Sequence, residues 1–179
     1  MSEAELYRVV SSEELYSGKL RGIRQLVETK DGRRFAHETI EHPGAVVVLP
    51  IDDTGRIVCV SQYRHSVGRV VLELPAGTLE LGEQPVVCAQ REIQEEIGLG
   101  AGQLKPLGTL YPAPGFCTEI QHLFVASDLY EKPAECDEDE DITVVRLTVQ
   151  AFEAAARDGT MQDAKSMALF MRARLEQLV

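Results

Sequence analysis

The chain has 179 residues, with 18 Lys and Arg against 29 Asp and Glu, and its net charge of −11 argues against a basic face for nucleic acid or an anionic membrane. Its length suits one domain with a short arm, and its 44% hydrophobic content is typical of a globular chain. No apolar run approaches the roughly 18 residues of a membrane span, and the N-terminal segment does not resemble a signal peptide. We therefore expect a cytoplasmic protein. Four cysteines without a CxxC pair predict free thiols.

Short runs of β-branched residues predict strands along most of the chain. The turn signal Asp52-Asp53-Thr54-Gly55 separates the first two of these runs and favours a hairpin. Segments 15–28 and 34–41 flank Lys30-Asp31-Gly32, which indicates another hairpin. The expected strands are Ala45–Ile51, Ile57–Tyr63, Val70–Leu74, Leu104–Leu110, Gln121–Ala126 and Thr143–Leu147.

Three segments have helical periodicity. The clearest is Gln84–Ile97, where Val86, Ala89, Ile93 and Ile97 recur every three or four residues and Gly98 follows as a left-handed terminator. The others are Ala164–Leu178 and a shorter piece near Val149–Ala156. Strands mixed with a few helices predict an α+β fold or an α/β/α sandwich.

The helix at 84–97 carries carboxylates where local rules disfavour them. Glu92, Glu95 and Glu96 are expected on one face, opposite the apolar stripe. Glu92 and Glu96 form a like-charged i, i+4 pair, which costs roughly 0.2–0.5 kcal/mol, and both lie near the negative end of the helix dipole. A hard divalent cation would reverse both effects. The alternative is an acidic face exposed to solvent.

The residues around this helix decide between these interpretations. They give the pattern G-x5-E-x7-R-E-U-x-E-E-x-G-U, where U is aliphatic, and every position is filled from Gly77 to Leu99. A chance match has a probability on the order of 10⁻⁹ per starting position. The chain thus resembles the Nudix hydrolases, which implies an α/β/α sandwich around a mixed sheet and metal-dependent hydrolysis of a nucleoside diphosphate linked to another group.

The resemblance also implies roles for single residues. Glu92 and Glu96 match the main metal ligands, with Mg²⁺ or Mn²⁺ as the cofactor. Glu95 matches a further ligand or a residue that positions water, and the carbonyl of Ala76 a ligand used by several members. Structural roles in the motif fall to Gly77, Glu83, Arg91 and Gly98, where Arg91 and Glu83 brace the loop against the helix.

Flanking motifs point to the substrate. The segments Gln62-Tyr63-Arg64, Leu72-Glu73-Leu74-Pro75-Ala76-Gly77 and Pro112-Ala113-Pro114-Gly115-Phe116 resemble the ADP-ribose pyrophosphatase branch, whose reaction gives AMP and ribose 5-phosphate. Hydrolases of other nucleoside diphosphate sugars, such as GDP-mannose, share much of the pattern, and a Nudix-fold nucleotide sensor without catalysis is a further alternative. Substrate-binding roles are expected for Arg64, Gly115, Phe116 and Glu119.

Residues 135–141 contain six acids in seven residues and are expected to form a loop. In the resembling branch this place holds a loop ending in E-x-E-D-I that bears a catalytic glutamate. Glu138 is the first choice for the general base and Glu140 the second, because glutamates bound to metal are poor proton acceptors. The alternative is a solubilising loop.

Residues 1–42 precede the domain expected at 43–179 and are predicted to form a strand arm. By resemblance, such an arm pairs with a second subunit and helps form the adenosine site, so we expect a homodimer that acts on a small nucleoside diphosphate sugar. Residues 80–99 and 135–141 contribute −4 and −6 to the net charge. The acidity is thus concentrated in the proposed metal site and its loop.

Overall fold

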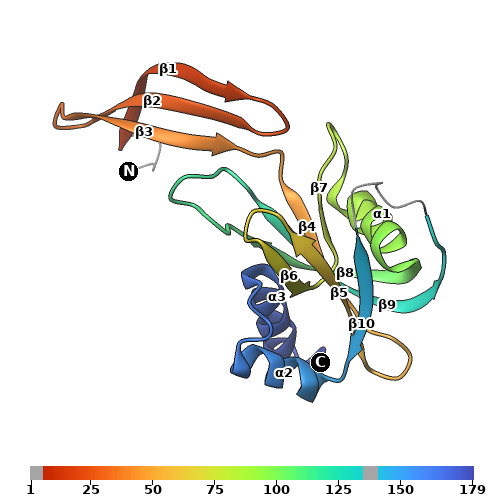
Figure 1. The fold of residues 1–179 in the computed structure, drawn as a ribbon. Coiled ribbons are helices and arrows are strands. Elements are labelled where there is room, and N and C mark those ends of the chain that lie inside the picture. The colour runs from red at the N-terminus through yellow and green to blue at the C-terminus, as the bar shows by residue number, and fades with distance from the viewer. Residues whose placement is uncertain (1–5, 135–140) are drawn as a thin grey trace.

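The structure is a computed structural model that describes residues 6–134 and 141–179. Figure 1 shows a strand arm at the N-terminus beside a body of strands flanked by helices. The strands are β1 (Tyr7–Ser17), β2 (Arg21–Thr29), β3 (Arg34–Glu41), β4 (Ala45–Pro50), β5 (Ile57–Arg64), β6 (Arg69–Glu73), β7 (Ala76–Thr78), β8 (Leu99–Leu110), β9 (Gln121–Glu131) and β10 (Ile142–Leu147), and the helices are α1 (Pro85–Ile97), α2 (Val149–Asp158) and α3 (Ala164–Leu175).

The body contains two sheets. One is mixed, in the order β7-β4-β9-β8, with β4 parallel to β9 and the other pairs antiparallel. The other is antiparallel, in the order β10-β5-β6. Every residue of β4 is buried, as expected of a strand covered on both faces.

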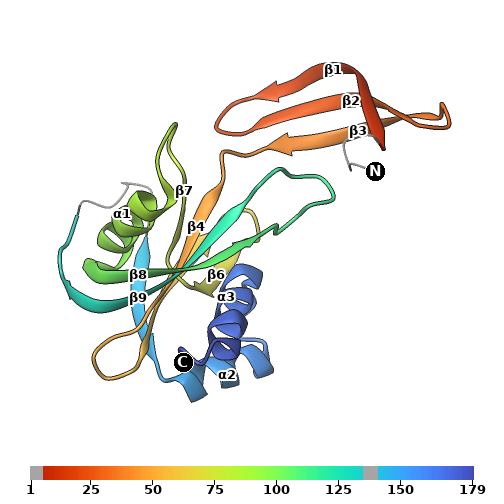
Figure 2. The same ribbon diagram turned by 180° about the vertical axis from the view of Figure 1, so that it is seen from behind.

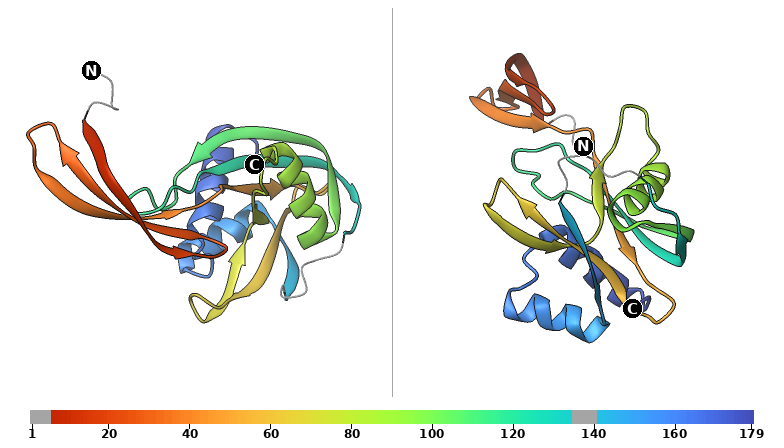
Figure 3. Two further views of the ribbon diagram at one scale, coloured as in Figure 1. Left: turned by 90° about the horizontal axis from the view of Figure 1, so that it is seen from above. Right: turned by 45° about the vertical axis from the view of Figure 1, so that its right-hand side comes forward.

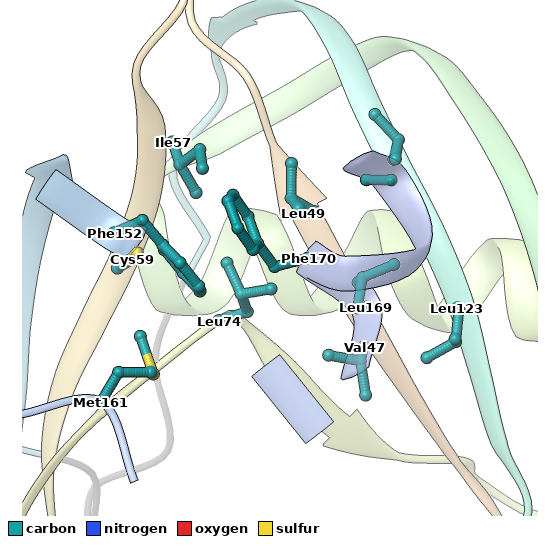
Figure 4. Packing of buried hydrophobic residues seen from close by; sticks show 12 residues of the cluster. Val47, Leu49, Ile57, Cys59, Leu74, Leu123, Phe152, Met161, Leu169 and Phe170 are labelled. Carbon is teal, nitrogen blue, oxygen red and sulfur yellow. The ribbon is translucent and has the colours of Figure 1, made fainter. Parts of the chain in front are cut away.

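Alternate residues of β4 pack against different helices. Val46 and Val48 join a cluster with Cys88, Ala89 and Ile93 of α1. Val47 and Leu49 join a cluster with residues of α2 and α3, including the stacked rings of Phe152 and Phe170, as Figure 4 shows. The strand layer therefore lies between α1 and the α2–α3 pair, which confirms the predicted α/β/α sandwich.

The arm is a separate antiparallel sheet in the order β1-β2-β3. It extends from one end of the body, and its outer strand β1 is exposed along all 11 residues (Figures 2 and 3). Its attachment lies at the end of β3, where Ile40 donates to the Phe116 carbonyl (2.7 Å) and Thr118 donates to the Ile40 carbonyl (2.9 Å). These bonds fix the direction in which the arm leaves the body.

The turn predicted at 52–55 forms, but the hairpin prediction was wrong. Asp52 caps the turn by accepting hydrogen bonds from the backbone of Thr54 (3.0 Å) and Arg56 (2.9 Å). Beyond one bridge between Ile51 and Ile57, β4 and β5 diverge into different sheets. The reason is that both edges of β4 are already paired, with β7 and β9.

Two other strand predictions need correction. Segment 15–28 is not one strand, because the chain turns at 18–20 between β1 and β2. Strand β8 begins at Leu99, five residues before the predicted start. The glycines there have little strand propensity, but pairing with β9 overrides it, and Gly100 leaves room for the ring of its cross-strand partner Tyr130.

Cys59, Cys88 and Cys117 are free thiols, as predicted, and Cys136 lies outside the described residues. Burial raises the pKa of the Cys59 thiol to about 12. No helix within residues 6–134 and 141–179 is long and apolar enough to cross a membrane.

Candidate active site

Helix α1 places the acidic residues of the motif. Pro85 occupies the first turn, where its missing N–H costs nothing, and Gly98 ends the helix with φ of 70°. Both ends agree with the prediction. One member of its apolar stripe differs from the prediction. Val86 is 49% exposed, and Cys88 is buried instead.

Glu92 and Glu96 do not lie opposite the apolar stripe, as the sequence had suggested. They are 8% and 5% exposed, and they follow Cys88 on one helical row that faces β7. Glu95 stays partly exposed, with 27% of its side chain accessible. Burial of two carboxylates has a large desolvation cost unless hydrogen bonds or cations compensate it.

Strand β7 supplies the space and one hydrogen bond for these carboxylates. A Cβ atom on Gly77 would lie only 1.8 Å from the Glu92 carboxylate, so only glycine leaves room for it. The backbone N–H of the preceding residue, Ala76, donates to Glu96 (3.1 Å). The glycine of the motif is therefore required by close approach of a side chain.

Arg91 links the loop after β7 to the helix. Its guanidinium donates two 3.0 Å bonds to Glu83, and its Nη1 donates to Glu92 (2.7 Å) and Glu95 (2.9 Å). It also donates to the Thr78 carbonyl (3.3 Å). Arg91 holds the pKa of Glu83 down at about 2, and Glu83, Glu92 and Glu95 in turn raise the pKa of Arg91. This group of charges orients the carboxylates along one wall of a cleft.

That cleft has a volume of about 520 Å³. Glu92, Glu95 and Arg91 form one part of its wall, and the segment Ala76–Glu80 forms another. Arg64 also lines it. Lys19, from the β1–β2 turn, also lines the cleft. No role was predicted for Lys19 from the sequence, and the Gly18-Lys19 turn is the one signal that could have singled it out.

Arg64 is held by a partner that sequence reasoning did not single out. Its Nε and Nη2 donate to the two oxygens of Glu73 (2.7 and 2.8 Å). Glu73 is 2% exposed and also accepts a bond from Lys165 of α3. An acidic residue between Leu72 and Leu74 was a sequence signal for a buried charge. Its second partner, Lys165, is 92 positions away, so the local sequence did not reveal the contact.

Three predicted substrate residues lie outside this cleft. Gly115 and Phe116 belong to the loop before β9, where Phe116 is 59% exposed beside the arm and lines a separate hollow with Ile40 and Leu15. Glu119 accepts a hydrogen bond from Gln121 (2.8 Å). Phe116 therefore lies beside the arm, and none of the three residues lines the cleft that contains Glu92.

The predicted bases Glu138 and Glu140 lie outside the described residues. The chain is described again from Asp141, and Ile142 pairs with Gln62 of β5, two positions before Arg64.

The carboxylates suit a divalent cation. Within the described ranges, no group of three acidic, histidine or cysteine side chains is arranged to hold a metal ion, and Arg91 bridges Glu92 and Glu95. The donor set nevertheless fits a hard ion: two buried carboxylates, a partly exposed third and the nearby Ala76 backbone supply only oxygen ligands. Because Gly77 has no side chain, the Glu92 carboxylate has room to lie at the wall of the cleft.

Comparison with known proteins agrees with this geometry. The family model described as NUDIX domain matches residues 41–170. The chain belongs to the Nudix family. The match spans β4 to most of α3 and includes the whole of α1.

Several Nudix relatives are similar over most of their length. The chain is 37% identical to an ADP-ribose pyrophosphatase of Bacillus subtilis, covering 89% of this chain and 88% of that one. It is 39% identical to an ADP-ribose pyrophosphatase of Mycobacterium tuberculosis, covering 77% and 69%. A solved structure titled as an ADP compounds hydrolase has the same fold, with a TM-score of 0.84, 24% identity and 94% and 92% coverage.

Proposed function

We propose that this Nudix protein hydrolyses the pyrophosphate bond of ADP-ribose to AMP and ribose 5-phosphate. The observation that carries the proposal is the pair of buried carboxylates, Glu92 and Glu96, on a helix of the Nudix domain, with Glu92 at the wall of an open cleft. Relatives named ADP-ribose pyrophosphatase, at 37% and 39% identity, support the choice of substrate.

Glu92 and Glu96 would hold the cofactor Mg²⁺ or Mn²⁺, with Glu95 and the Ala76 carbonyl assisting. When bound, the metal neutralises the diphosphate and lowers the pKa of coordinated water. The chain itself supplies the geometry: Gly77 leaves room for the Glu92 carboxylate, and Gly98 ends the helix that presents it. Arg91 bonds both to Glu83 of the loop and to Glu92 of the helix, and so holds the loop against the carboxylates.

Other residues complete the proposed site. Arg64 would contact a phosphate, since a guanidinium can donate two parallel hydrogen bonds to it. Glu138, with Glu140 as the second choice, would accept the proton from the attacking water. Gly115, Phe116 and Glu119 would contact the sugar or base from the side of the arm.

The arm would pair two subunits into a homodimer. The support is the exposed edge strand β1, which carries large apolar side chains such as Tyr7, Val9 and Tyr16, all at least 53% exposed. A second subunit on this side would also bring the loop at 115–119 into a composite site. A cytoplasmic location remains a prediction of the sequence.

Paired substitutions test the metal carboxylates. Glu92→Gln and Glu96→Gln keep the shape of the side chain but lose its charge, so each should lower kcat by about two orders of magnitude or more while the protein stays folded. Glu153→Gln, on α2, is the matched control and should retain activity. Near-normal turnover in either α1 variant, measured with Mg²⁺ and ADP-ribose, would refute the assignment.

Hydrolysis of another nucleoside diphosphate sugar is the second candidate. It is supported by a 28% identical GDP-mannose pyrophosphatase of Salmonella arizonae, which covers 89% of this chain. A comparison of kcat/KM for ADP-ribose and GDP-mannose separates the two. Binding of ADP-ribose without turnover across several divalent metals would instead indicate a sensor.

A further inference from the structure

Glu73 lies buried between two cations, one of which, Arg64, lines the cleft. The Nε and Nη2 of Arg64 donate to its two oxygens, and the ammonium group of Lys165 donates to one of them. Only 3% of the Glu73 side chain is exposed. Burial raises the pKa of this carboxyl, but the bonds and charges of Arg64 and Lys165 outweigh it and lower the pKa overall. Glu73 is therefore an ionised carboxylate shared by both cations.

The contacts continue from Lys165 to the first turn of α3. Lys165 also donates to Asp163 (3.0 Å), which caps the helix by accepting from the Ser166 backbone (3.0 Å) and hydroxyl. The Ser166 oxygen accepts from the backbone of Leu74 (2.7 Å), the residue after Glu73. The charges thus alternate from Arg64 to Asp163 and end at the partial positive charge of the helix N-terminus.

Arg64 is the exposed end of this charge network. Its side chain is 36% exposed, against 3% for Glu73 and 16% for Lys165, and it lines the cleft. A guanidinium carries five N–H donors. Glu73 occupies the Nε and Nη2 edge, and the Nη1 group makes no hydrogen bond to any residue in the described ranges. One edge of the guanidinium is therefore fixed and another is available.

We propose that Glu73 and Lys165 are positioning residues, which hold Arg64 so that its Nη1 edge meets the diphosphate of the substrate. This inference rests on the proposed function. Glu73 binds one edge of the guanidinium, and Lys165 binds the same carboxylate and fixes its position. The resulting fixed rotamer of Arg64 avoids an ordering cost when substrate binds.

A double-mutant cycle on Arg64 and Lys165 tests the proposal. Lys165→Met removes the charge and keeps the length, and it should raise KM for ADP-ribose about tenfold with a much smaller change in kcat. In an Arg64→Ala background, the same Lys165→Met change should have almost no further effect, because there is no guanidinium left to position. A purely structural role for Lys165 would lower kcat/KM equally in both backgrounds, and that result would overturn the proposal.

Two further variants exclude a general loss of packing. Lys165→Arg retains the cation and should restore KM. Arg69→Met removes a different hydrogen bond between β6 and the segment before α3, that of Arg69 to Gln162 (2.8 Å), and should leave KM unchanged. If Lys165→Met does not fold, Glu73→Gln replaces it in the same cycle, with the same non-additivity expected.

The result for the wild-type protein separates failure of this proposal from failure of the proposed function. If the wild type hydrolyses ADP-ribose and the two substitutions are additive, the positioning role alone is refuted. If the wild type does not hydrolyse ADP-ribose, the proposed function fails, and the cycle is measured as the affinity for inorganic pyrophosphate with Mg²⁺. Non-additive losses of that affinity would still support the network, and additive losses would refute it.

Discussion

Gly77→Ala separates the geometry of the active site from the stability of the fold. The new Cβ would lie 1.8 Å from the Glu92 carboxylate, whereas ordinary contacts are about 3.4–4 Å. The carboxylate must therefore move by roughly 1.5 Å. Because a misplacement of about 1 Å at a reacting centre can cost 10²-fold, we expect kcat/KM to fall at least about 100-fold.

The same substitution should change stability little. The atoms that the Cβ meets are the end of a flexible side chain, which can rotate away, so the cost should lie at the low end of the roughly 1–3 kcal/mol typical of overpacking. Gly22→Ala is the control, because its Cβ would make only ordinary contacts of 3.7 Å. Steady-state kinetics with Mg²⁺ and thermal unfolding measure the two effects. Unchanged kcat/KM in Gly77→Ala would refute the close packing of Glu92 on β7.

Three other predictions concern a turn, the acidic loop and the arm. Burial raises the pKa of Asp52, but the hydrogen bonds of its turn outweigh this and lower it from 3.8 to about 2. Asp52→Asn should thus cost about 1–2 kcal/mol at pH 7, and this difference should vanish as the pH falls from 3.8 toward 2 in denaturant titrations; a pH-independent cost would contradict it. Glu138→Gln should lower kcat far more than Glu140→Gln, and equal small losses would remove the base from this loop. Because Lys19 lines the cleft, Lys19→Ala should raise KM for ADP-ribose about tenfold. Lys30→Ala, in the other turn of the arm, is the control and should leave KM unchanged. Equal KM values for the two variants would exclude Lys19 from substrate binding.

Local sequence patterns predicted the helix and the candidate carboxylates. The limits of α1 follow from apolar periodicity and from Gly98, both of which act within one or two turns. The spacing from Gly77 to Gly98 identified the motif without any tertiary information. The roles of these residues in catalysis stay predictions.

Features that depend on distant parts of the chain could not be predicted in this way. The burial of Glu92 and Glu96 arises because β7 crosses their side of α1. The pairing of Glu73 with Lys165 joins two positions 92 residues apart, and Lys19 reaches the cleft only because the end of β3 fixes the arm. Local periodicity contains no information on such contacts.

The central claim is tested most directly by product analysis of the wild-type protein with ADP-ribose, with and without a divalent metal. The account predicts equal amounts of AMP and ribose 5-phosphate, formed only when Mg²⁺ or Mn²⁺ is present, and a higher kcat/KM than for GDP-mannose. Metal-independent cleavage, or no cleavage of ADP-ribose with either metal, would contradict it.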